Sequence, residues 1–295
     1  MNRSNIRELL NQGERHLVEN GVPNARKNVE WMLGHVLDCR STDLYLAGTG
    51  ELPGGKIRDY EELVRRRGAR EPLQYILGST EFMGLPFLAA PGVFIPRPDT
   101  EILVEAVETR MNMLGEPRTI LDLCCGSGVI AVSLAKRVNA ASAIAVDISS
   151  KAVELTARNA TLNGVESKVR AVCAEAVEYL TRSDQQFDAV VCNPPYVPRA
   201  DIPDLSPEIR IHEPLTGLDG GDDGQDFYRA SIPLLRRVLR PGGLVAFEIG
   251  SHQRRGVSEL MRAAAFPHID THQDFGGADR VIVACEESSS GSTMD

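Results

Sequence analysis

The chain has 295 residues, of which 42% are hydrophobic and 25% charged, so it can bury a core and is neither disordered nor fibrous. This length exceeds what one hydrophobic core usually serves, which favours a large domain with a smaller one attached. No apolar run approaches the length of a membrane span, and the polar, charged start is unlike a signal peptide. We therefore expect a cytoplasmic protein.

Charge and cysteine content narrow the possible partners and cofactors. Residues 1–95 carry 12 basic and 12 acidic side chains, whereas residues 96–295 carry 20 and 29. Binding to a phosphate backbone draws its affinity from Lys and Arg, so the acidic excess of the longer part argues against a nucleic-acid substrate. The six cysteines show neither the paired spacing of a zinc site nor the density of a disulfide scaffold. We expect reduced thiols and no metal site.

Residues 1–73 are predicted to form a small helical domain, because apolar residues recur there at helical spacing in three stretches. The four arginines between residues 65 and 70 form the only dense basic cluster in the sequence. A solvated helix end is the favoured interpretation, since the helix dipole favours cations there, although the cluster could complement an acidic patch on a partner. Residues 74–98 alternate short apolar stretches with Gly and Pro, which predicts a hairpin or a linker between two parts.

Strand and helix patterns alternate through residues 99–285. Strands are expected at 119–123, 143–146, 169–173, 189–192, 244–249 and 280–284, and helices near 102–107 and at 129–138, 150–162, 225–239 and 253–265. Parallel neighbours need crossover connections, so this alternation implies a mostly parallel sheet with helices on both faces. The predicted fold class is therefore doubly wound α/β. The small, polar tail at 286–295 is expected to be disordered.

A glycine-containing loop follows the first of these strands. The loop reads Cys124-Cys125-Gly126-Ser127-Gly128 and opens a helix, whose N-terminus presents free N–H groups. Nineteen residues past Gly128, Asp147 closes the next strand, where a carboxylate accepts hydrogen bonds from both hydroxyls of a ribose. We therefore expect a nucleotide-like ligand at this edge of the sheet. The loop and the helix start also fit a dinucleotide fingerprint, and a tight turn without a ligand is the simplest alternative.

An unusual turn, Asn193-Pro194-Pro195-Tyr196, follows the fourth strand. The prolines remove two backbone donors and leave a rigid turn whose carbonyls point outward. A planar –NH2 group can then be held by the Asn193 side chain and the Pro194 carbonyl, with the Tyr196 ring available for stacking. Accepting both hydrogens favours the electron-rich geometry of that nitrogen, and a sulfonium methyl in the adjoining loop would supply the electrophile at close range. The alternative is a purely structural turn.

With both motifs in place, the chain closely resembles the PrmC (HemK) family, the N5-glutamine methyltransferases of peptide chain release factors. Further segments carry the resemblance over nearly the whole length: 70–78, 81–82, 95–101, 213–214, 220–224, 241–243 and 248–250. The resemblance implies a seven-stranded, Rossmann-like class I methyltransferase domain whose last strand is antiparallel, with 269–273 and 280–284 as its final hairpin. It also implies a small helical N-terminal domain that docks the substrate and a β-hairpin linker.

The same resemblance implies S-adenosylmethionine-dependent methylation of the glutamine in the Gly-Gly-Gln motif of class I release factors, which modulates translation termination. Cofactor contacts would come from Cys124, Cys125, Gly126, Ser127, Gly128, Asp147, Glu175, Ala176 and Asn193. The substrate glutamine and the catalytic step would involve Asn193, Pro194, Pro195 and Tyr196. Two positions depart from the family pattern: Cys124 replaces a glycine, and Ala176 stands where an aromatic residue is common. Taken alone, Glu175 would be a solvated loop residue.

Three other functions are weighed against this one. An amino-methyltransferase acting on DNA adenine or ribosomal RNA would need a basic recognition surface, which the charge counts do not supply. A nicotinamide-dependent oxidoreductase would leave the turn at 193–196 without a role. A non-enzymatic binding module explains neither motif. Release factors are therefore the expected partners, with no membrane and no direct nucleic-acid substrate.

Overall fold

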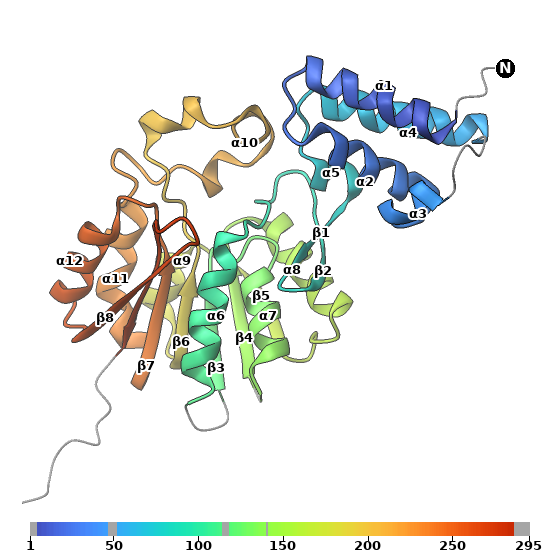
Figure 1. Cartoon of the computed structure of the whole chain (residues 1–295). Coiled ribbons are helices and arrows are strands. Elements are labelled where there is room, and N and C mark those ends of the chain that lie inside the picture. Colours follow the sequence, from blue (N-terminus) through green and yellow to red (C-terminus); the bar gives the residue numbers. More distant parts are fainter. Residues whose placement is uncertain (1–4, 47–51, 114–117, 140, 286–295) are drawn as a thin grey trace, which may run out of the picture. The chain divides into compact units, whose positions relative to one another are not determined.

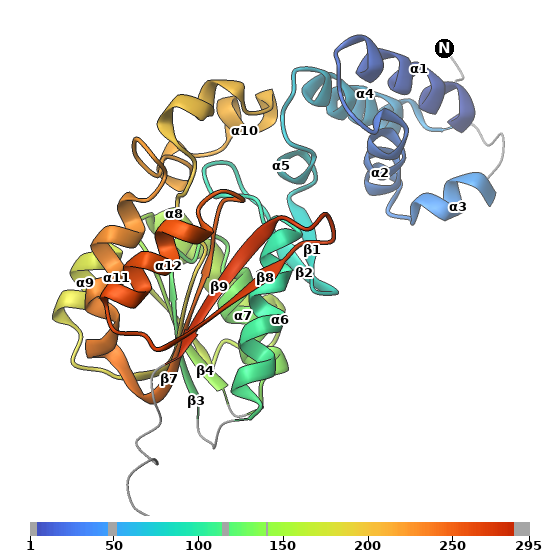
Figure 2. The same ribbon diagram turned by 60° about the vertical axis from the view of Figure 1, so that its left-hand side comes forward.

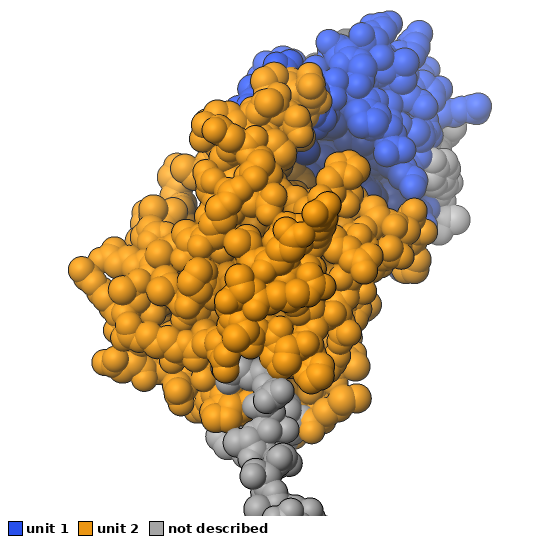
Figure 3. All heavy atoms as spheres, turned by 90° about the vertical axis from the view of Figure 1, so that its left-hand side faces the viewer, with its two compact units in different colours: residues 1–79, 206–212 blue, residues 80–205, 213–295 orange. Residues whose placement is uncertain are grey.

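A computed structural model describes residues 5–46, 52–113, 118–139 and 141–285, so the predicted tail at 286–295 lies outside the described residues. The chain forms two compact units, coloured separately in Figure 3. The first contains residues 1–79 and 206–212, and the second contains residues 80–205 and 213–295. Residues 206–212 thus belong with the N-terminal helices although the chain on either side of them belongs to the second unit.

The first unit is helical. Its elements are α1 (Ile6–Glu19), α2 (Ala25–Leu37), α3 (Ser41–Leu46), α4 (Gly54–Gly68), α5 (Leu73–Leu77) and α10 (Pro207–His212). Asn5 caps α1 by accepting a hydrogen bond from the Glu8 N–H at 2.9 Å, and the apolar faces of α1, α2 and α4 pack together around Leu17 and Leu33. These three helices match the three predicted stretches. The short helices α3 and α5 were not predicted, because they have too few turns to show a period.

Only part of the arginine cluster at the end of α4 is a solvated helix end, since Arg65 is exposed but Arg67 is not. Arg67 is 4% exposed and donates to Asn28 Oδ1 and to Glu208 Oε1, each at 2.8 Å. Arg70 donates to both oxygens of the same carboxylate, at 2.8 and 2.6 Å. Burial opposes the ionisation of Glu208, but the hydrogen bonds from Arg70 and Arg67 prevail and lower its pKa to about 2. The prediction was wrong for Arg67 and Arg70, because their partner Glu208 lies far away in the sequence, on α10.

The second unit is built on a seven-stranded sheet of order β5-β4-β3-β6-β7-β9-β8 within the described residues. The strands are β3 (Arg118–Leu123), β4 (Ala141–Asp147), β5 (Val169–Cys173), β6 (Phe187–Cys192), β7 (Leu239–Glu248), β8 (His268–Gln273) and β9 (Asp279–Cys285). Strands β3 to β7 run parallel, and β9 runs antiparallel to both of its neighbours. The predicted α/β class, the seven strands and the antiparallel last strand are confirmed.

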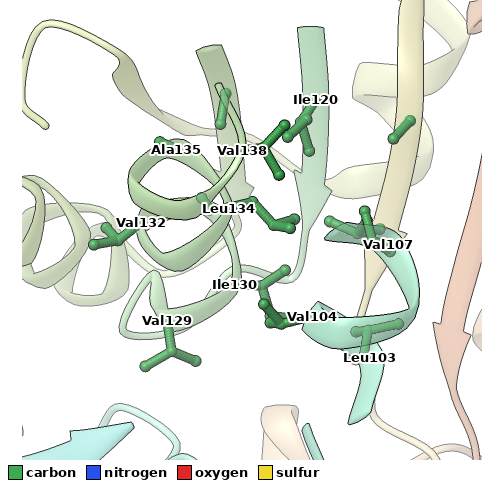
Figure 4. Close-up of a cluster of buried hydrophobic side chains, with 14 of the residues drawn as sticks. Leu103, Val104, Val107, Ile120, Val129, Ile130, Val132, Leu134, Ala135 and Val138 are labelled. Carbon is green, nitrogen blue, oxygen red and sulfur yellow. The ribbon is translucent and has the colours of Figure 1, made fainter. Parts of the chain in front are cut away.

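Helices cover both faces of this sheet (Figures 1 and 2). They are α6 (Asp99–Met111), α7 (Val129–Arg137), α8 (Ser150–Leu162), α9 (Ala176–Arg182), α11 (Asp226–Val238) and α12 (Arg254–Ala263). Side chains alternate between two cores: Ile120 of β3 packs with α6 and α7, as Figure 4 shows, whereas Leu121 packs with α11 and α12. Both strand faces are therefore buried, which explains the unbroken apolar runs of the sequence.

A short hairpin precedes the sheet, within the range where the sequence predicts one. Its strands are β1 (Ser79–Phe82) and β2 (Leu85–Leu88), and Met83 and Gly84 between them both have positive φ, as a tight hairpin turn requires. Phe82 and Phe87 meet edge to face with ring centroids 6.1 Å apart. Within the second unit, Asn159 of α8 accepts a hydrogen bond from the Leu88 N–H at 2.7 Å, which ties β2 to α8.

The strand order fixes where a ligand can bind. Since β3, β4, β5 and β6 are parallel neighbours, their carboxyl ends lie along one edge of the sheet. The connections leave β3 toward β4 on one side, while β6 lies on the other, so the order reverses between β3 and β6. In open α/β sheets the crevice outside such a reversal is the usual ligand site. The segment between β6 and α11 contains η1 (Arg199–Asp204) and η2 (Leu215–Gly217) and returns the chain to this edge.

Candidate active site

A cavity of about 510 Å³ opens at this edge of the sheet, within the second unit. Its size is in the range of pockets that bind small molecules. Of the site residues predicted from the sequence, all except Gly128 line it: Cys124, Cys125, Gly126, Ser127, Asp147, Glu175, Ala176, Asn193, Pro194, Pro195 and Tyr196. The loop after β3 and the turn after β6 therefore face one shared space.

The two glycines of the loop have different tasks. Both have positive φ, +55° for Gly126 and +80° for Gly128. A Cβ built on Gly126 would meet no described atom within 4 Å, so the backbone there borders open space that a ligand can approach. A Cβ on Gly128 would lie 2.7 Å from Thr156 Cγ2. Gly128 thus allows α7 to start close against α8, which is why it lies behind the cavity wall.

Asp147, at the end of β4, holds the loop and leaves acceptor capacity free. Its Oδ2 accepts the Gly126 N–H at 2.8 Å, and its Oδ1 accepts the Ser149 N–H at 2.9 Å. A carboxylate oxygen can accept a second hydrogen bond, so both atoms suit the two hydroxyls of a ribose. Ser127 also lines the cavity, and its buried Oγ has no hydrogen-bond partner among the described residues. These groups fit a nucleoside-containing cofactor.

Glu175 has a structural task that the sequence analysis did not anticipate. It is the N-cap of α9, and its carboxylate accepts the Val177 N–H at 3.1 Å and the Glu178 N–H at 2.7 Å. Glu175 still lines the cavity beside the buried Ala176.

The turn after β6 presents its side chains to the cavity through specific contacts. Asn193 Nδ2 donates to Thr100 Oγ1 at 3.1 Å, and Tyr196 Oη donates to Glu248 Oε1 at 3.1 Å. Gln253 Nε2 donates to the Tyr196 carbonyl at 2.9 Å, which fixes the end of the turn. Burial, followed by the neighbouring Glu248, raises the pKa of Tyr196, so the phenol keeps its proton.

Thr100 and Glu248 are parts of the site that the sequence analysis did not single out. Thr100 lies at the start of α6 and lines the cavity, and Glu248 lies behind it at the end of β7. Both are 1% exposed, and the Thr100 hydroxyl lies 2.6 Å from Glu248 Oε2. Burial raises the pKa of Glu248 to about 7, although hydrogen bonds from Thr100 and Tyr196 oppose the shift. The available signal was their position in the segments 95–101 and 248–250.

Other cavity walls come from segments with no predicted site residue. Phe94 lies before α6, Leu215 opens η2 and Phe227 lies in α11.

In the described part of the chain, no cluster of three or more His, Cys, Asp or Glu side chains could hold a metal ion. None of the described helices is long and apolar enough to cross a membrane.

Comparisons with known proteins cover nearly the whole chain. A family model described as PrmC N-terminal domain matches residues 8–78, and one described as methyltransferase small domain matches residues 84–206. The release factor glutamine methyltransferase of Geobacter sulfurreducens is 41% identical over 94% of this chain and 95% of its own length. That of Moorella thermoacetica is 39% identical over 95% and 98%.

Among solved structures, a 16S rRNA methyltransferase of T. thermophilus in complex with AdoMet and guanosine has a TM-score of 0.51 and 21% identity. The match covers 71% of this chain and 50% of that one and shows a shared fold. The relatives at about 40% identity, matched end to end, go further and confirm the resemblance inferred from the motifs. The chain belongs to the family of release factor glutamine methyltransferases.

Proposed function

We propose that this enzyme transfers the methyl group of S-adenosylmethionine to the side-chain amide nitrogen, N5, of the glutamine in the Gly-Gly-Gln motif of class I release factors, and so modulates translation termination. The observation that carries the proposal is the shared cavity. It brings a loop suited to a nucleoside and a turn suited to an –NH2 group to the same space. Membership of the release factor glutamine methyltransferase family supports the same substrate.

The cofactor half of the cavity would be formed by the loop from Cys124 to Gly128, which Gly128 shapes from behind. Asp147 would accept the ribose hydroxyls, while Glu175 and Ala176 would border the adenine. S-adenosylmethionine supplies a methyl group on a positively charged sulfur, which is an electrophile. Asn193 lies where this half meets the acceptor half. Because Cys124 is bulkier than glycine, it would narrow the cavity at the loop.

The acceptor half would be formed by Asn193, Pro194, Pro195 and Tyr196. Asn193 Oδ1 and the Pro194 carbonyl would each accept one hydrogen of the substrate amide. An amide nitrogen is a weak nucleophile because its lone pair is delocalised. Holding both hydrogens favours the pyramidal geometry in which that pair can form the new N–C bond. Positioning the nitrogen in line with the methyl group then lowers the barrier. The S–CH3 bond would break as the N–C bond forms, and S-adenosylhomocysteine would leave with the electron pair of the broken bond. The nitrogen would become acidic and lose its proton to solvent, so no strong base is needed.

The N-terminal helical domain, residues 1–73, would dock the body of the release factor, and residues 74–98 would link it to the catalytic domain at 99–285. A single glutamine offers few atoms, so selecting one requires binding energy from surfaces remote from the reacting nitrogen. The arginines near the end of α4 are an unsuitable docking patch, because Arg67 and Arg70 are committed to Glu208. We therefore expect the enzyme to show a much higher kcat/KM on intact release factor than on a short Gly-Gly-Gln peptide.

Nucleic acid is the alternative acceptor, since the solved rRNA methyltransferase shares the fold. The charge of residues 96–295, 20 basic against 29 acidic, does not favour it. Incubation with labelled S-adenosylmethionine and separate pools of release factor, DNA and ribosomal RNA tests the choice. Label in the release factor alone supports the proposal, and label in either nucleic acid refutes it. The cytoplasmic location stays a prediction.

A further inference from the structure

The buried side chains of Thr100 and Glu248 and the partly buried side chain of Asn193 form a chain of hydrogen bonds at the acceptor half of the cavity. Thr100 Oγ1 lies 2.6 Å from Glu248 Oε2, and Asn193 Nδ2 lies 3.1 Å from Thr100 Oγ1. The three residues come from the start of α6, the end of β7 and the turn after β6. Of these three residues, Asn193 and Thr100 line the cavity and Glu248 does not. Glu248 can therefore act on a substrate only through its neighbours.

The chemistry of the middle residue sets the direction of the chain. A threonine hydroxyl has one proton to donate, and an ionised carboxylate can only accept. Thr100 must therefore donate to Glu248 and accept from Asn193. The nitrogen and oxygen of an asparagine amide are distinguished by such partners. Asn193 consequently turns its nitrogen toward Thr100, and none of the described residues donates a hydrogen bond to its Oδ1.

Protonation of Glu248 removes this constraint. A carboxylic acid can donate to Thr100, which frees the threonine proton to point at Asn193. The Asn193 amide can then rotate, place its oxygen on Thr100 and turn its own –NH2 toward the cavity. A substrate –NH2 would meet a donor instead of an acceptor. The ionised state of Glu248 is thus the one that presents an acceptor to the substrate amide.

We propose that Thr100 and Glu248 are positioning residues that fix the Asn193 amide with its oxygen toward the acceptor, so that the site selects an –NH2 group over a carboxylate. This inference rests on the proposed role of Asn193 in binding the substrate amide. The specificity of the site for an amide follows from this orientation, because a glutamate in place of the glutamine would bring a carboxylate oxygen against Asn193 Oδ1. Two acceptors without a shared hydrogen repel each other.

The surroundings of Glu248 make this orientation sensitive to pH. Burial raises its pKa to about 7, while hydrogen bonds from Thr100 and Tyr196 lower it, Asp99 raises it and Arg280 lowers it. Asp99 and Arg280 are themselves paired at 3.3 Å, and their effects on the pKa of Glu248 have opposite signs. The Tyr228 hydroxyl donates to the Glu248 backbone carbonyl at 2.7 Å and does not contact its carboxylate. Methyl transfer should decline as the pH falls through about 7, where Glu248 gains its proton.

Two substitutions at Thr100 separate positioning from packing. Thr100→Val keeps the shape and removes both hydrogen bonds, whereas Thr100→Ser keeps the hydroxyl and removes a methyl group. With the full chain and intact release factor, we expect kcat of Thr100→Val to fall by about 10²-fold, the scale for losing one aligned polar group. KM and S-adenosylmethionine affinity should change little. Thr100→Ser should stay within a few-fold of wild type. Equal loss in both variants, or wild-type kcat in Thr100→Val, would overturn the inference.

A third variant covers the case in which Thr100→Val does not fold. Glu248→Gln has no proton to gain, so its rate should no longer decline between pH 8 and pH 6, the interval around the Glu248 pKa. An unchanged acid limb in this variant contradicts the inference. Failure of the proposed function gives a different result, because the wild type itself would then leave the release factor unmethylated. In that case the NMR signal of the Asn193 side-chain –NH2 still decides. It should shift with Glu248 ionisation in wild type and not in Glu248→Gln.

Discussion

Replacing Asp147 with alanine is expected to weaken S-adenosylmethionine binding strongly. The carboxylate is the proposed acceptor for the ribose hydroxyls, and hydrogen bonds to charged groups contribute ~1.5–3 kcal/mol. That range corresponds to a ~10- to 150-fold rise in Kd. The structure adds a second cost, because the Gly126 and Ser149 N–H groups lose their acceptors at 2.8 and 2.9 Å. The loop that is proposed to border the cofactor would be less ordered, so the upper part of the range is expected.

Asp147→Asn is predicted to bind almost as weakly, although it keeps the size of the side chain. Both carboxylate oxygens accept a backbone N–H, and an amide can place an oxygen toward only one of them. Its –NH2 would face the other N–H, donor against donor. Isothermal titration calorimetry measures the S-adenosylmethionine Kd of the wild type, Asp147→Ala and Asp147→Asn. Asp184→Ala is the control for loss of an acidic residue at a fully exposed site. Wild-type affinity in Asp147→Asn, or equal loss in Asp184→Ala, would refute the reasoning.

Three further predictions follow from single contacts. Asn193→Ala should lower kcat by about 10²-fold or more while S-adenosylmethionine Kd stays within a few-fold; steady-state kinetics with near-wild-type turnover would remove Asn193 from the mechanism. Gly128→Ala should destabilise the fold by ~1–3 kcal/mol, because φ is +80° and the new Cβ meets Thr156, whereas Gly126→Ala meets open space and should cost less; thermal unfolding that ranks the two in reverse order contradicts this. The pKa of Glu208 is lowered from its ordinary value of 4.5 to about 2, so its contribution to stability is full above pH 4.5 and is lost as the pH falls toward 2. Denaturant unfolding of Glu208→Gln should show a weaker loss of stability over that interval. An unchanged acid dependence would argue against the pair with Arg67 and Arg70.

The parts of the structure that could be predicted from the sequence depend on local pattern. The loop from Cys124 to Gly128 follows a strand and opens a helix within a dozen residues, so its conformation and position are encoded nearby. Asp147 ends β4 and Asn193 directly follows β6, and both strands are parallel neighbours of β3. Because the carboxyl ends of parallel strands lie at one edge of the sheet, the two residues come to the same edge. The predicted strands were correct within a few residues. β7 begins five residues earlier than expected, at Leu239, because Pro241, Gly242 and Gly243 hide its start.

The parts that could not be predicted depend on contacts between residues far apart in the chain. Thr100 and Glu248 form a hydrogen bond although they are 148 positions apart in the sequence. A single threonine in a helix or a single glutamate in a strand forms no repeating pattern that would point to such a contact. Arg67 and Glu208 are 141 positions apart in the sequence, and their ion pair buries Arg67 within a cluster that was expected to be solvated. Gly128 is expected at the cofactor because of its motif, and the motif gives no sign that Thr156 of α8 packs against this glycine. In each case the deciding neighbour belongs to another element.

The position of the transferred methyl group tests the central proposal most directly. The full chain is incubated with purified class I release factor and isotopically labelled S-adenosylmethionine, and the release factor is then digested and its peptides are sequenced by mass spectrometry. We predict one labelled methyl group on the side-chain nitrogen of the glutamine in Gly-Gly-Gln, and none when that glutamine is replaced by alanine or glutamate. A methyl group on another residue, persistence of labelling in the replaced protein, or an unlabelled wild-type release factor would contradict the account.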